Sequence, residues 1–419
     1  MNNSKPNIIV SHPTGNANLR AALDGFEQNK ILAAFYTCIA TQNNTVFSLL
    51  SKLPGMSEFK RRAFGENLTP FIHSYPSHEL MRLLSMKAGF SGLIQHEVGK
   101  FSIDAVYQNL DKIVAKALAN NNSNNKYNAV YAYEDGALNS FKSAAQNGIK
   151  CLYDLPIGYW KAARVLMAEE IQKRPDWAAT LSGFSDSELK TKRKDEELAL
   201  ADHIFVASSF TAQTLSHYPG TLKDISVIPY GFPNVEEIKS YKRKENQKLK
   251  FLFVGGLSQR KGIADIFDAV EPLKDFVELT VVGRLPNNDV PVLNKALENC
   301  NYIPSLAHSE ILKLMKENDV LLFPSLFEGF GLVITEAMSQ GTPVITTNRT
   351  VGPDIITHGE NGWIIEAGNH IALCEMMEQL IHNPELIELN GRAAHKLASS
   401  RPWNVYGNEL AEKVIKVLA

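Results

Sequence analysis

The sequence predicts an α/β protein made of two doubly wound domains with parallel sheets. The chain has 419 residues, which is too long for one ordinary core and fits two domains of roughly 200 residues each. Its hydrophobic content of 44% supports large buried cores. Short apolar runs alternate with helical patterns along the chain, as they do where parallel strands are buried on both faces. Two such domains would enclose a cleft.

Apolar runs predict the strands of each domain. Those of the first domain are 7–13, 30–40, 128–134, 149–156, 203–209 and 224–232, and those of the second are 248–256, 277–284, 318–325 and 342–347. Between the two series, the basic and polar stretch 241–250 predicts a linker. We therefore expect a first domain at 1–234 and a second at 235–402.

Composition excludes several classes of function. Lys and Arg number 43 against 45 Asp and Glu, so the net charge of −2 gives no reason to expect a nucleic-acid partner. The cysteines are far apart and form neither zinc-ligand pairs nor a disulfide framework; they are Cys38, Cys151, Cys300 and Cys374. No apolar stretch approaches the ~20 residues of a membrane helix, and the N-terminus leads directly into a strand. We expect buried thiols and a cytoplasmic protein.

A glycine-rich loop with two cations follows the strand predicted at 248–254. Gly255 and Gly256 would let a ligand approach the backbone closely. Arg260 and Lys261 precede the next helix, where cations oppose the helix dipole unless an anion is bound. A diphosphate would supply that anion. The alternative interpretation is that both side chains extend into water.

Two glutamates in the segment FPSLFEGFGLVITEAM predict a second part of the same site. Glu328 lies in a glycine-rich loop and Glu336 in the helix that follows it. If phosphate oxygens bind the N–H groups of Leu332 and Val333, Glu336 lies about 5–8 Å further along the axis, within reach of ribose hydroxyls. Glu328 would instead accept hydrogen bonds from the sugar. Each glutamate alone is equally typical of a helix start, but the combination indicates a nucleotide-sugar site.

The chain resembles the family 4 retaining glycosyltransferases of GT-B fold. The resemblance is carried by VGGLSQRKG, by PSLFEGFGLVITEAMSQGTPVI, and by ADHIFVASSFTAQ together with VIPYGF, and it covers the chain from about residue 199 onward. It implies two Rossmann-like domains that face a deep cleft. It also implies that Arg260 and Lys261 hold the donor diphosphate, that Glu328 contacts the transferred sugar, and that Glu336 binds the ribose.

The resemblance implies further donor contacts. Ile303, in the stretch 301–304, matches the place where family members hold the nucleobase through backbone groups and apolar packing. The C-terminal helix, 403–419, is expected to pack back onto the first domain, and its amphipathic pattern fits that role. The remaining residues expected at the donor are Gly255, Gly256, Gly329, Phe330, Gly331, Leu332 and Val333.

Loops after predicted strands of the first domain are the candidates for the acceptor or donor-sugar side, because open α/β sheets bind ligands there. The candidate residues are His12, Gly15, Asn16, Glu134, Asp135, Asp154 and Tyr159. A lone histidine at a strand end is also typical of a structural hydrogen bond. Many family members carry a histidine that contacts the transferred sugar near the position of Asp154, so this departure leaves the donor sugar open.

The mechanism implied by the resemblance is transfer with retention. The anomeric carbon–oxygen bond would open while Arg260, Lys261 and helix N–H groups stabilise the departing diphosphate. The chain lacks an Asp-x-Asp pair, with which many other glycosyltransferases bind a divalent ion. We therefore expect no metal and no cofactor. Glu328 would orient the sugar rather than attack it.

The expected donor is a UDP- or GDP-sugar, and the expected acceptor is a saccharide or a lipid-linked glycan in bacterial-type surface polysaccharide assembly. Alternatives are a GT-B sugar-nucleotide epimerase or phosphorylase and a non-catalytic sugar-nucleotide-binding protein. A dinucleotide oxidoreductase would need G-x-G-x-x-G after the first strand. A glycoside hydrolase gives no reason for cations beside glycines.

Two segments of the first domain carry further expectations. The basic triplet Lys60-Arg61-Arg62 is a candidate contact for a lipid-phosphate acceptor, with peripheral association at the inner face of a membrane, although its isolation in the first domain argues against that role. The helical segment 161–194, which contains Trp177, is expected to cover the first sheet. A role as a lid is the alternative.

Overall fold

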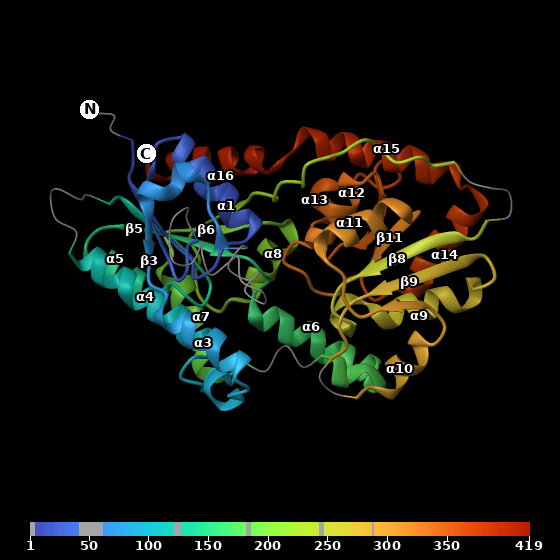
Figure 1. Ribbon diagram of the computed structural model, residues 1–419, viewed down its shortest axis with the longest axis horizontal. Helices are drawn as coiled ribbons and strands as arrows, with labels where there is room; N and C mark the ends of the chain where they lie inside the picture. Colours follow the sequence, from blue (N-terminus) through green and yellow to red (C-terminus); the bar gives the residue numbers. More distant parts are fainter. Residues whose placement is uncertain (1–4, 42–61, 121–126, 182–185, 243–246, 287–288) are drawn as a thin grey trace.

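The fold consists of two all-parallel sheets flanked by helices (Figure 1). The computed structural model describes residues 5–41, 62–120, 127–181, 186–242, 247–286 and 289–419. In the first sheet the strand order is β3-β2-β1-β4-β5-β6-β7, and in the second it is β10-β9-β8-β11-β12-β13. Both orders are those of doubly wound, Rossmann-like sheets. The predicted fold class is confirmed.

The strands of the first sheet come from the first half of the chain. They are β1 (Ile8–Ser11), β2 (Leu32–Thr37), β3 (Ile72–Ser74), β4 (Ala129–Tyr133), β5 (Lys150–Leu155), β6 (His203–Val206) and β7 (Asp224–Val227). The second sheet follows without any exchange of strands. Its members are β8 (Leu249–Val254), β9 (Val277–Val282), β10 (Asn301–Ile303), β11 (Val320–Phe323), β12 (Val344–Thr347) and β13 (Trp363–Ile365).

Helices connect the parallel strands. Those before β8 are α1 (Ala17–Gln28), α3 (Ser77–Lys87), α4 (Ile103–Ala119), α5 (Leu138–Gln146), α6 (Trp160–Lys173), α7 (Glu188–Leu200) and α8 (Ser209–Thr214). Those after it are α9 (Ile263–Val270), α10 (Pro291–Leu297), α11 (His308–Glu317), α12 (Leu332–Ser339), α13 (Gly352–Ile355), α14 (His370–His382), α15 (Glu385–Ser400) and α16 (Trp403–Leu418). The 3-10 turns are η2 (Glu66–Phe71), η3 (Ser91–Ile94), η4 (Pro175–Thr180), η6 (Leu215–His217), η7 (Gln259–Lys261) and η8 (Glu271–Leu273).

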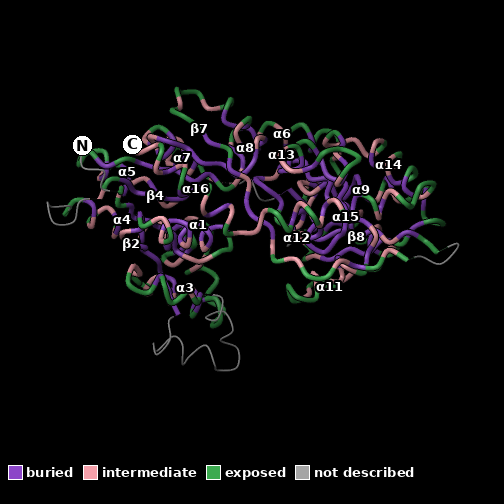
Figure 2. The backbone as a smooth tube through the Cα atoms, turned by 90° about the horizontal axis from the view of Figure 1, so that it is seen from above, coloured by how far each residue is buried: buried purple, intermediate pink, exposed green. Residues whose placement is uncertain are grey.

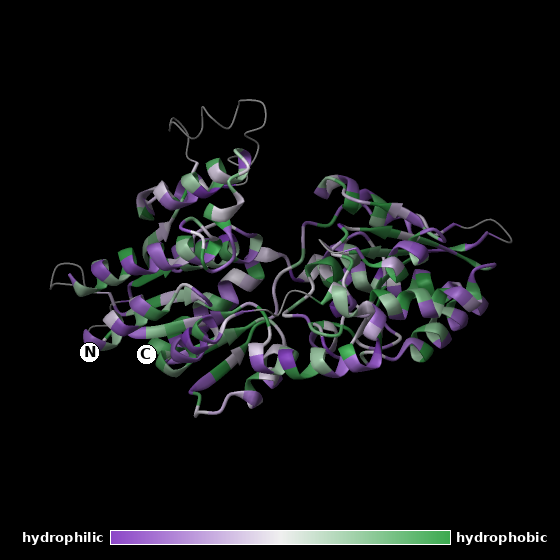
Figure 3. Ribbon diagram, turned by 90° about the horizontal axis from the view of Figure 1, so that it is seen from below, coloured by the Kyte–Doolittle hydropathy of each residue, from purple (hydrophilic) through white to green (hydrophobic). Residues whose placement is uncertain are grey.

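The central strands are apolar on both faces because helices cover both sides of each sheet. β1 is buried along its whole length, and so are β4 and β11. In Figure 2 the buried colour follows the strands of both halves, and Figure 3 shows the same strands as largely hydrophobic. The alternation of apolar runs and helices in the sequence reflects this layering.

Each sheet reverses its strand order next to its first strand. In the first sheet β2 and β4 flank β1, and in the second β9 and β11 flank β8. Loops that leave neighbouring strands in opposite directions open a crevice at such a point, where open α/β sheets bind ligands. The loops after β1 and β8 both begin at such a crevice.

Two glycines allow the halves of the molecule to touch closely. A Cβ atom on Gly329 would lie 2.1 Å from the carbonyl oxygen of Pro156, and one on Gly158 would lie 2.5 Å from the ring of Phe327. Both contacts join the loop after β5 to the loop after β11. A larger residue at Gly329 would require the backbone at Pro156 to move, and one at Gly158 would require the Phe327 ring to move.

The C-terminal helix returns to the first sheet. α16 lies beside α1 (Figure 1), and a Cβ atom on Gly25 would come within 2.1 Å of the carbonyl oxygen of Gly407. Tyr406 and Leu410 of α16 belong to the same buried apolar cluster as residues of α1 and β1. The first half of the molecule is therefore completed by a helix that follows the second sheet in the chain.

Only the last part of the segment 161–194 covers the first sheet as predicted, where α7 packs against α5 and β5. Trp177, in η4, packs in the core of the second sheet, where its ring stacks near Phe267 with a centroid distance of 6.2 Å. α6 carries the chain from one half of the molecule to the other along one side (Figure 1). An apolar side chain pairs with whichever core lies within reach, which a local pattern cannot reveal.

Two basic stretches of the sequence lie partly outside the described residues. Of the predicted linker, residues 243–246 lie outside the described residues, while Tyr241 donates from its hydroxyl to the carbonyl oxygen of Gly341 at 2.6 Å. Of the basic triplet, Lys60 and Arg61 also lie outside the described residues. Arg62 is buried and pairs with Glu79 at 2.5 Å, so it does not face a membrane.

Candidate donor site

A cavity of about 400 Å³ lies where the loops after β1 and β8 meet. Both halves of the molecule contribute to its walls. The lining residues from the first half are Asn16, Asn18, Pro156 and Tyr230, and those from the second are Val254, Gly255, Gly256, Lys261, Phe323, Glu328, Phe330, Gly331, Leu332, Val333 and Glu336. Most residues predicted to bind the donor are therefore brought together around one space.

The loop after β8 presents Lys261 to the cavity. The loop turns at Gly262, whose φ of +71° lies in the left-handed region and whose Cβ position would lie 2.1 Å from the carbonyl oxygen of Pro324. Only glycine fits both constraints. Gly255 and Gly256 also line the cavity, and a Cβ atom on Gly256 would meet nothing within 4 Å. A ligand can thus approach the backbone at Gly256.

Lys261 and Glu328 form an ion pair at the cavity wall. Each side chain is only 14% exposed, and the ammonium also lies 4.9 Å from the centre of the Phe323 ring. Burial lowers the pKa of Lys261, while the carboxylate of Glu328 acts in the opposite direction. A partly desolvated cation beside glycines is suited to bind phosphate oxygens.

Arg260 is not among the residues that line the cavity, but it lies beside Glu328 at the cavity wall, so its contact with the diphosphate stays a prediction. Its guanidinium donates to the carbonyl oxygen of Phe327 at 2.8 Å and to Glu328 Oε2 at 3.2 Å. Its own carbonyl oxygen accepts from Leu326 N–H at 2.8 Å and from Ser325 Oγ at 3.0 Å. Arg260 thus ties the loop after β8 to the loop that carries Glu328, with its side chain 24% exposed.

The N-terminus of α12 forms the opposite wall. Gly331 starts the helix with a φ of +94°, and the following residues Leu332 and Val333 line the cavity. Free N–H groups in a first helical turn attract anions. Glu336 lies one turn further on, lines the same cavity, and has its pKa raised by burial. Its Oε1 lies 3.8 Å from Nδ1 of His308.

The first half of the molecule contributes polar groups that the sequence only partly indicated. Asn16 caps α1, accepting from Leu19 N–H at 2.9 Å, and lines the cavity. Asn18 and Tyr230 also line it and are hydrogen-bonded to each other at 3.2 Å. Asn18 stands in the predicted loop and Tyr230 in the VIPYGF segment, so their motifs were visible although their roles were not. Gly15 packs on Phe64 and Arg20 instead of lining the cavity.

His12 is buried behind the cavity and not on its surface. The Thr14 N–H donates to its Nδ1 at 3.1 Å, and its ring meets that of Tyr133 edge to face at 4.7 Å. Burial lowers the pKa of His12 to about 4, so the ring is neutral at pH 7. Its structural role agrees with the alternative interpretation of a histidine at a strand end.

Asp154 is buried among tyrosines and is absent from the cavity lining. It accepts a hydrogen bond of 2.5 Å from the hydroxyl of Tyr131, and burial raises its pKa to about 7. Tyr159 is also wholly buried, and its hydroxyl donates to Asp195 at 2.8 Å. Neither residue reaches the cavity, because both side chains turn back into the core of the first half.

Glu134 and Asp135 lie at a second, smaller pocket system. Glu134 lines a pocket of about 100 Å³ and contacts Lys194 at 3.3 Å. Burial raises the pKa of Glu134 to about 7. Asp135 has a φ of +72° and pairs with Arg193 at 2.7 Å. The structure separates these two carboxylates from the larger cavity, although Phe327 lies on the small pocket and Glu328 on the large one.

Ile303 lies at the end of β10 and not on the cavity wall. Its carbonyl oxygen accepts from Gly283 N–H at 3.0 Å, and its side chain packs against the apolar core. The predicted backbone contact with a nucleobase would have to use other groups of the 301–304 stretch.

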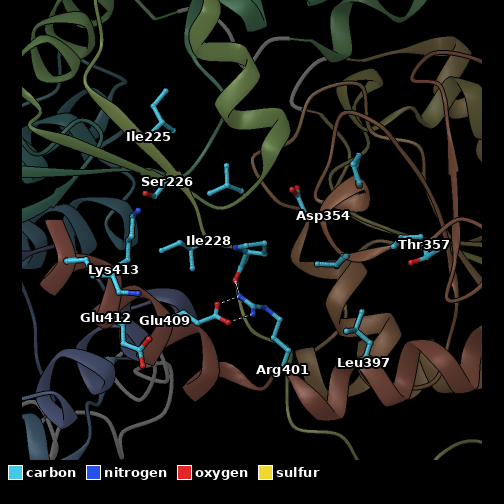
Figure 4. A pocket seen from close by; sticks show the side chains of 16 residues that line it. Ile225, Ser226, Ile228, Asp354, Thr357, Leu397, Arg401, Glu409, Glu412 and Lys413 are labelled. Carbon is cyan, nitrogen blue, oxygen red and sulfur yellow. Dashed lines mark hydrogen bonds and ion pairs between the residues drawn. The ribbon is translucent and has the colours of Figure 1, made fainter.

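A larger groove of about 760 Å³ lies away from these loops, between β7, α13 and α16 (Figure 4). Arg401 crosses it and pairs with Glu409 at 2.6 Å. Its walls come from an edge strand and helix sides, not from loops at the crevice of either sheet. The smaller cavity, with its glycines, cation and helix N-terminus, is the better candidate for the donor site.

Among the described residues, one group of side chains has the spacing of metal ligands. It consists of His96, Glu97 and Asp186, none of which lines the cavity. Also within the described ranges, no helix is both long and apolar enough to cross a bilayer. All four cysteines are free thiols, with Cys38 and Cys151 buried and the other two half-buried.

Comparison with known proteins finds a family model that matches part of the second half. Residues 234–396 match the family model "Glycosyl transferases group 1". The capsular polysaccharide biosynthesis glycosyltransferase CapM of Staphylococcus aureus is 28% identical over 247 residues, which are 54% of this chain and 65% of CapM. The D-inositol 3-phosphate glycosyltransferase of Pseudarthrobacter chlorophenolicus is 27% identical over 216 residues, or 47% of this chain and 51% of that protein. The chain thus spans only half to two thirds of these relatives.

Solved structures share the fold over nearly the whole chain. Sucrose-phosphate synthase of Thermosynechococcus elongatus aligns with a TM-score of 0.62 and 15% identity, covering 98% of this chain and 99% of that one. Anabaena HepE in complex with UDP aligns with a TM-score of 0.60 and 16% identity, covering 98% and 100%. At this identity the likeness concerns the fold. The protein therefore has the two-domain GT-B fold, with a glycosyl transferases group 1 domain at residues 234–396.

Proposed function

We propose that the protein is a retaining glycosyltransferase that moves a sugar from a UDP- or GDP-sugar to a saccharide or lipid-linked glycan. The observation that carries this proposal is the pairing of Lys261 with Glu328 at a cavity that also holds the N-terminus of α12 and Glu336. The cation and the free helix N–H groups match the diphosphate of a nucleotide-sugar. The two carboxylates match its sugar and its ribose.

In the proposed mechanism, Lys261 and the N–H groups of Leu332 and Val333 stabilise the diphosphate as it leaves the anomeric carbon. Glu328 orients the sugar hydroxyls from the side of the cation. The acceptor oxygen attacks from the leaving-group face, and a donor phosphate oxygen takes its proton. The new glycosidic bond then has the configuration of the bond that was broken.

The proposed reaction needs no metal ion, since a buried ammonium supplies positive charge at the diphosphate. The carboxylate of Glu328 is engaged with Lys261 and Arg260, so it is poorly placed to hold a divalent ion as well. UDP is a reasonable first nucleotide to test, because one structural neighbour is described as a complex with UDP-glucose. Capsule-type polysaccharide assembly at the cytoplasmic face of a membrane is the proposed setting, in line with the name of CapM.

The test is a calorimetric screen of UDP, GDP and their common sugar conjugates with EDTA or with magnesium. We expect one nucleotide to bind equally well in both conditions and to lose affinity in Lys261→Ala. Absence of binding by any nucleotide would overturn the proposal. Incubation with a panel of saccharide acceptors then separates a transferase, which forms a glycoside, from an epimerase or a non-catalytic binding protein.

A further inference from the structure

The loop that carries Lys261 is held from behind by a segment that precedes it by about eighty residues. Ser258 Oγ donates to the carbonyl oxygen of Thr180 at 2.7 Å, and Gln259 N–H donates to the Thr180 hydroxyl at 2.9 Å. Ser258 and Gln259, which make these two bonds, immediately precede Arg260 in the chain. The contact therefore joins η4 directly to the cation loop.

Gln259 is the centre of this contact. Its side chain has no solvent exposure. Its Nε2 donates to Glu170 Oε1 of α6 at 2.8 Å and to Asp265 Oδ2 of α9 at 3.3 Å, while its Oε1 accepts from Ala264 N–H at 2.9 Å. A buried amide with all these bonds fixes the backbone that carries it, because each unmade bond would leave a desolvated polar group.

Charged groups fasten the same segment on its far side. Arg174 pairs with Asp265 and Asp268, both at 2.7 Å. Lys173 donates to the carbonyl oxygen of Gly368 at 2.5 Å. The end of α6 is thereby attached to α9 and to the loop before α14, both in the second half of the molecule.

The middle of α6 contacts the other side of the donor site. Ala162, Ala163 and Met167 pack against Leu326 and Phe327, the two residues immediately before Glu328. A single helix therefore touches both loops whose tips meet as the Lys261–Glu328 pair. Arg260 links the two loops directly, because its guanidinium donates to the carbonyl oxygen of Phe327.

We propose that residues 160–180 form a positioning strap, which through Gln259 keeps the cation loop and the Glu328 loop in register for donor binding. The inference rests on the proposed donor site but assigns a role to a segment that does not touch the donor. Gln259, Thr180 and Glu170 are positioning residues. Small misplacements of catalytic groups reduce rates strongly. Loss of the strap contacts should therefore weaken nucleotide binding and turnover at the cavity.

The test compares two buried amides of the second half. Gln259→Leu removes the amide of the strap contact. Asn390→Leu removes one on α15, whose Oδ1 accepts from Gly362 N–H at 2.9 Å and which is equally buried. Both variants are expected to unfold at lower temperature. Well below both midpoints, titration with UDP and GDP should show at least about a tenfold weaker affinity in Gln259→Leu alone.

A milder variant keeps the proposal testable if Gln259→Leu does not fold. Thr180→Val preserves shape and removes the hydroxyl, which accepts from Gln259 N–H and donates to the carbonyl oxygen of Trp177 at 2.7 Å within η4. We expect weaker nucleotide binding and a lower kcat for donor turnover, with losses that do not add to those of Gln259→Leu in the double variant.

Three outcomes are distinguishable. Weak binding confined to the strap variants supports the proposal. Equal losses in Gln259→Leu and Asn390→Leu, or none in Thr180→Val, would overturn it while leaving the donor site intact. If the wild-type protein binds neither nucleotide, the proposed function itself fails.

Discussion

Ser208 Oγ donates to the carbonyl oxygen of Gly329 at 2.7 Å, so a side chain at the start of α8 holds the backbone directly after Glu328. The hydroxyl of Thr211 donates to the same oxygen at 3.0 Å. The two halves of the molecule thus meet at the residue next to the proposed sugar-orienting group. Any change in their separation is transmitted to the cavity.

Gly329→Ala should separate the halves at this contact. The added methyl would lie 2.1 Å from the carbonyl oxygen of Pro156, so backbone must move. We expect donor turnover to fall by about 100-fold or more, since misplacing reacting groups by about an ångström has that effect. Gly92→Ala is the control, because a Cβ there meets nothing within 4 Å. Normal turnover in Gly329→Ala would show that the contact is not needed.

Lys261→Met should weaken nucleotide binding. The substitution keeps an unbranched apolar side chain and removes the ammonium, which lies over the Phe323 ring. We expect the affinity for UDP or GDP to fall by roughly 10- to 100-fold, as for loss of a charged partner in a desolvated site. Calorimetry measures the change, with Lys274→Met as the matched control, since that lysine is 63% exposed on the same half. Equal affinities of wild type and Lys261→Met would remove the diphosphate from this loop.

Glu328→Gln should reduce transfer far more than nucleotide binding. The amide keeps the size of the side chain and removes the charge that pairs with Lys261. We expect kcat to drop by about 100-fold, while UDP binds as well as before or better, because the ammonium no longer has a carboxylate partner. Steady-state kinetics and calorimetry on one preparation separate the two effects. A parallel loss of binding would instead assign Glu328 to structure.

Glu336→Gln should weaken recognition of the ribose. The carboxylate lies one turn inside α12 on the cavity wall, and burial raises its pKa. We expect UDP to bind about tenfold more weakly, as for loss of a charge-assisted hydrogen bond. In the same experiment, the preference of the wild type for UDP over 2′-deoxy- and 3′-deoxy-UDP should shrink in the variant. An unchanged preference would place the ribose elsewhere.

Asp154→Asn should alter how stability depends on pH. Burial raises the pKa of Asp154 from its usual 3.8 to about 7. The folded state therefore keeps a proton that the unfolded state releases, and this stabilisation is complete below pH ~4 and lost as the pH rises to ~7. Denaturation at pH 5 and pH 8 should show a smaller difference in unfolding free energy for the variant. Glu134 and Glu197 also have raised pKa values, and they contribute equally to both proteins.

Much of the fold could be predicted because the strands are continuous apolar runs. β8 and β11 are bounded by glycines and by prolines or polar turns, so their loops were visible in the sequence. The same loops bring Lys261 and Glu328 into contact, since both follow neighbouring parallel strands and end at one edge of the sheet. Their meeting follows from topology as soon as the strands are assigned.

The remaining features of the candidate site depend on the direction in which each side chain points, which the sequence does not give. Arg260 and Lys261 are equivalent in a sequence motif, but Lys261 lines the cavity, while Arg260 donates to the carbonyl oxygen of Phe327 and to Glu328. Asp154 lies near the end of β5 and Tyr159 in the loop after it, where open α/β sheets bind ligands, yet their side chains turn into a core that only tertiary packing defines. Position along a strand predicts proximity, not direction.

The return of α16 to α1 has a consequence for synthesis. When a ribosome has produced β1 to β7, the face of α1 that receives Gly407 and Leu410 still lacks its cover. The whole second sheet, about 150 residues, must emerge before that cover arrives, which at typical elongation rates takes on the order of 10 s. An apolar stripe on α1 therefore stays exposed while the second sheet folds. Truncation before residue 403 should therefore yield a chain that aggregates from its N-terminal half, although no residue of that half is missing.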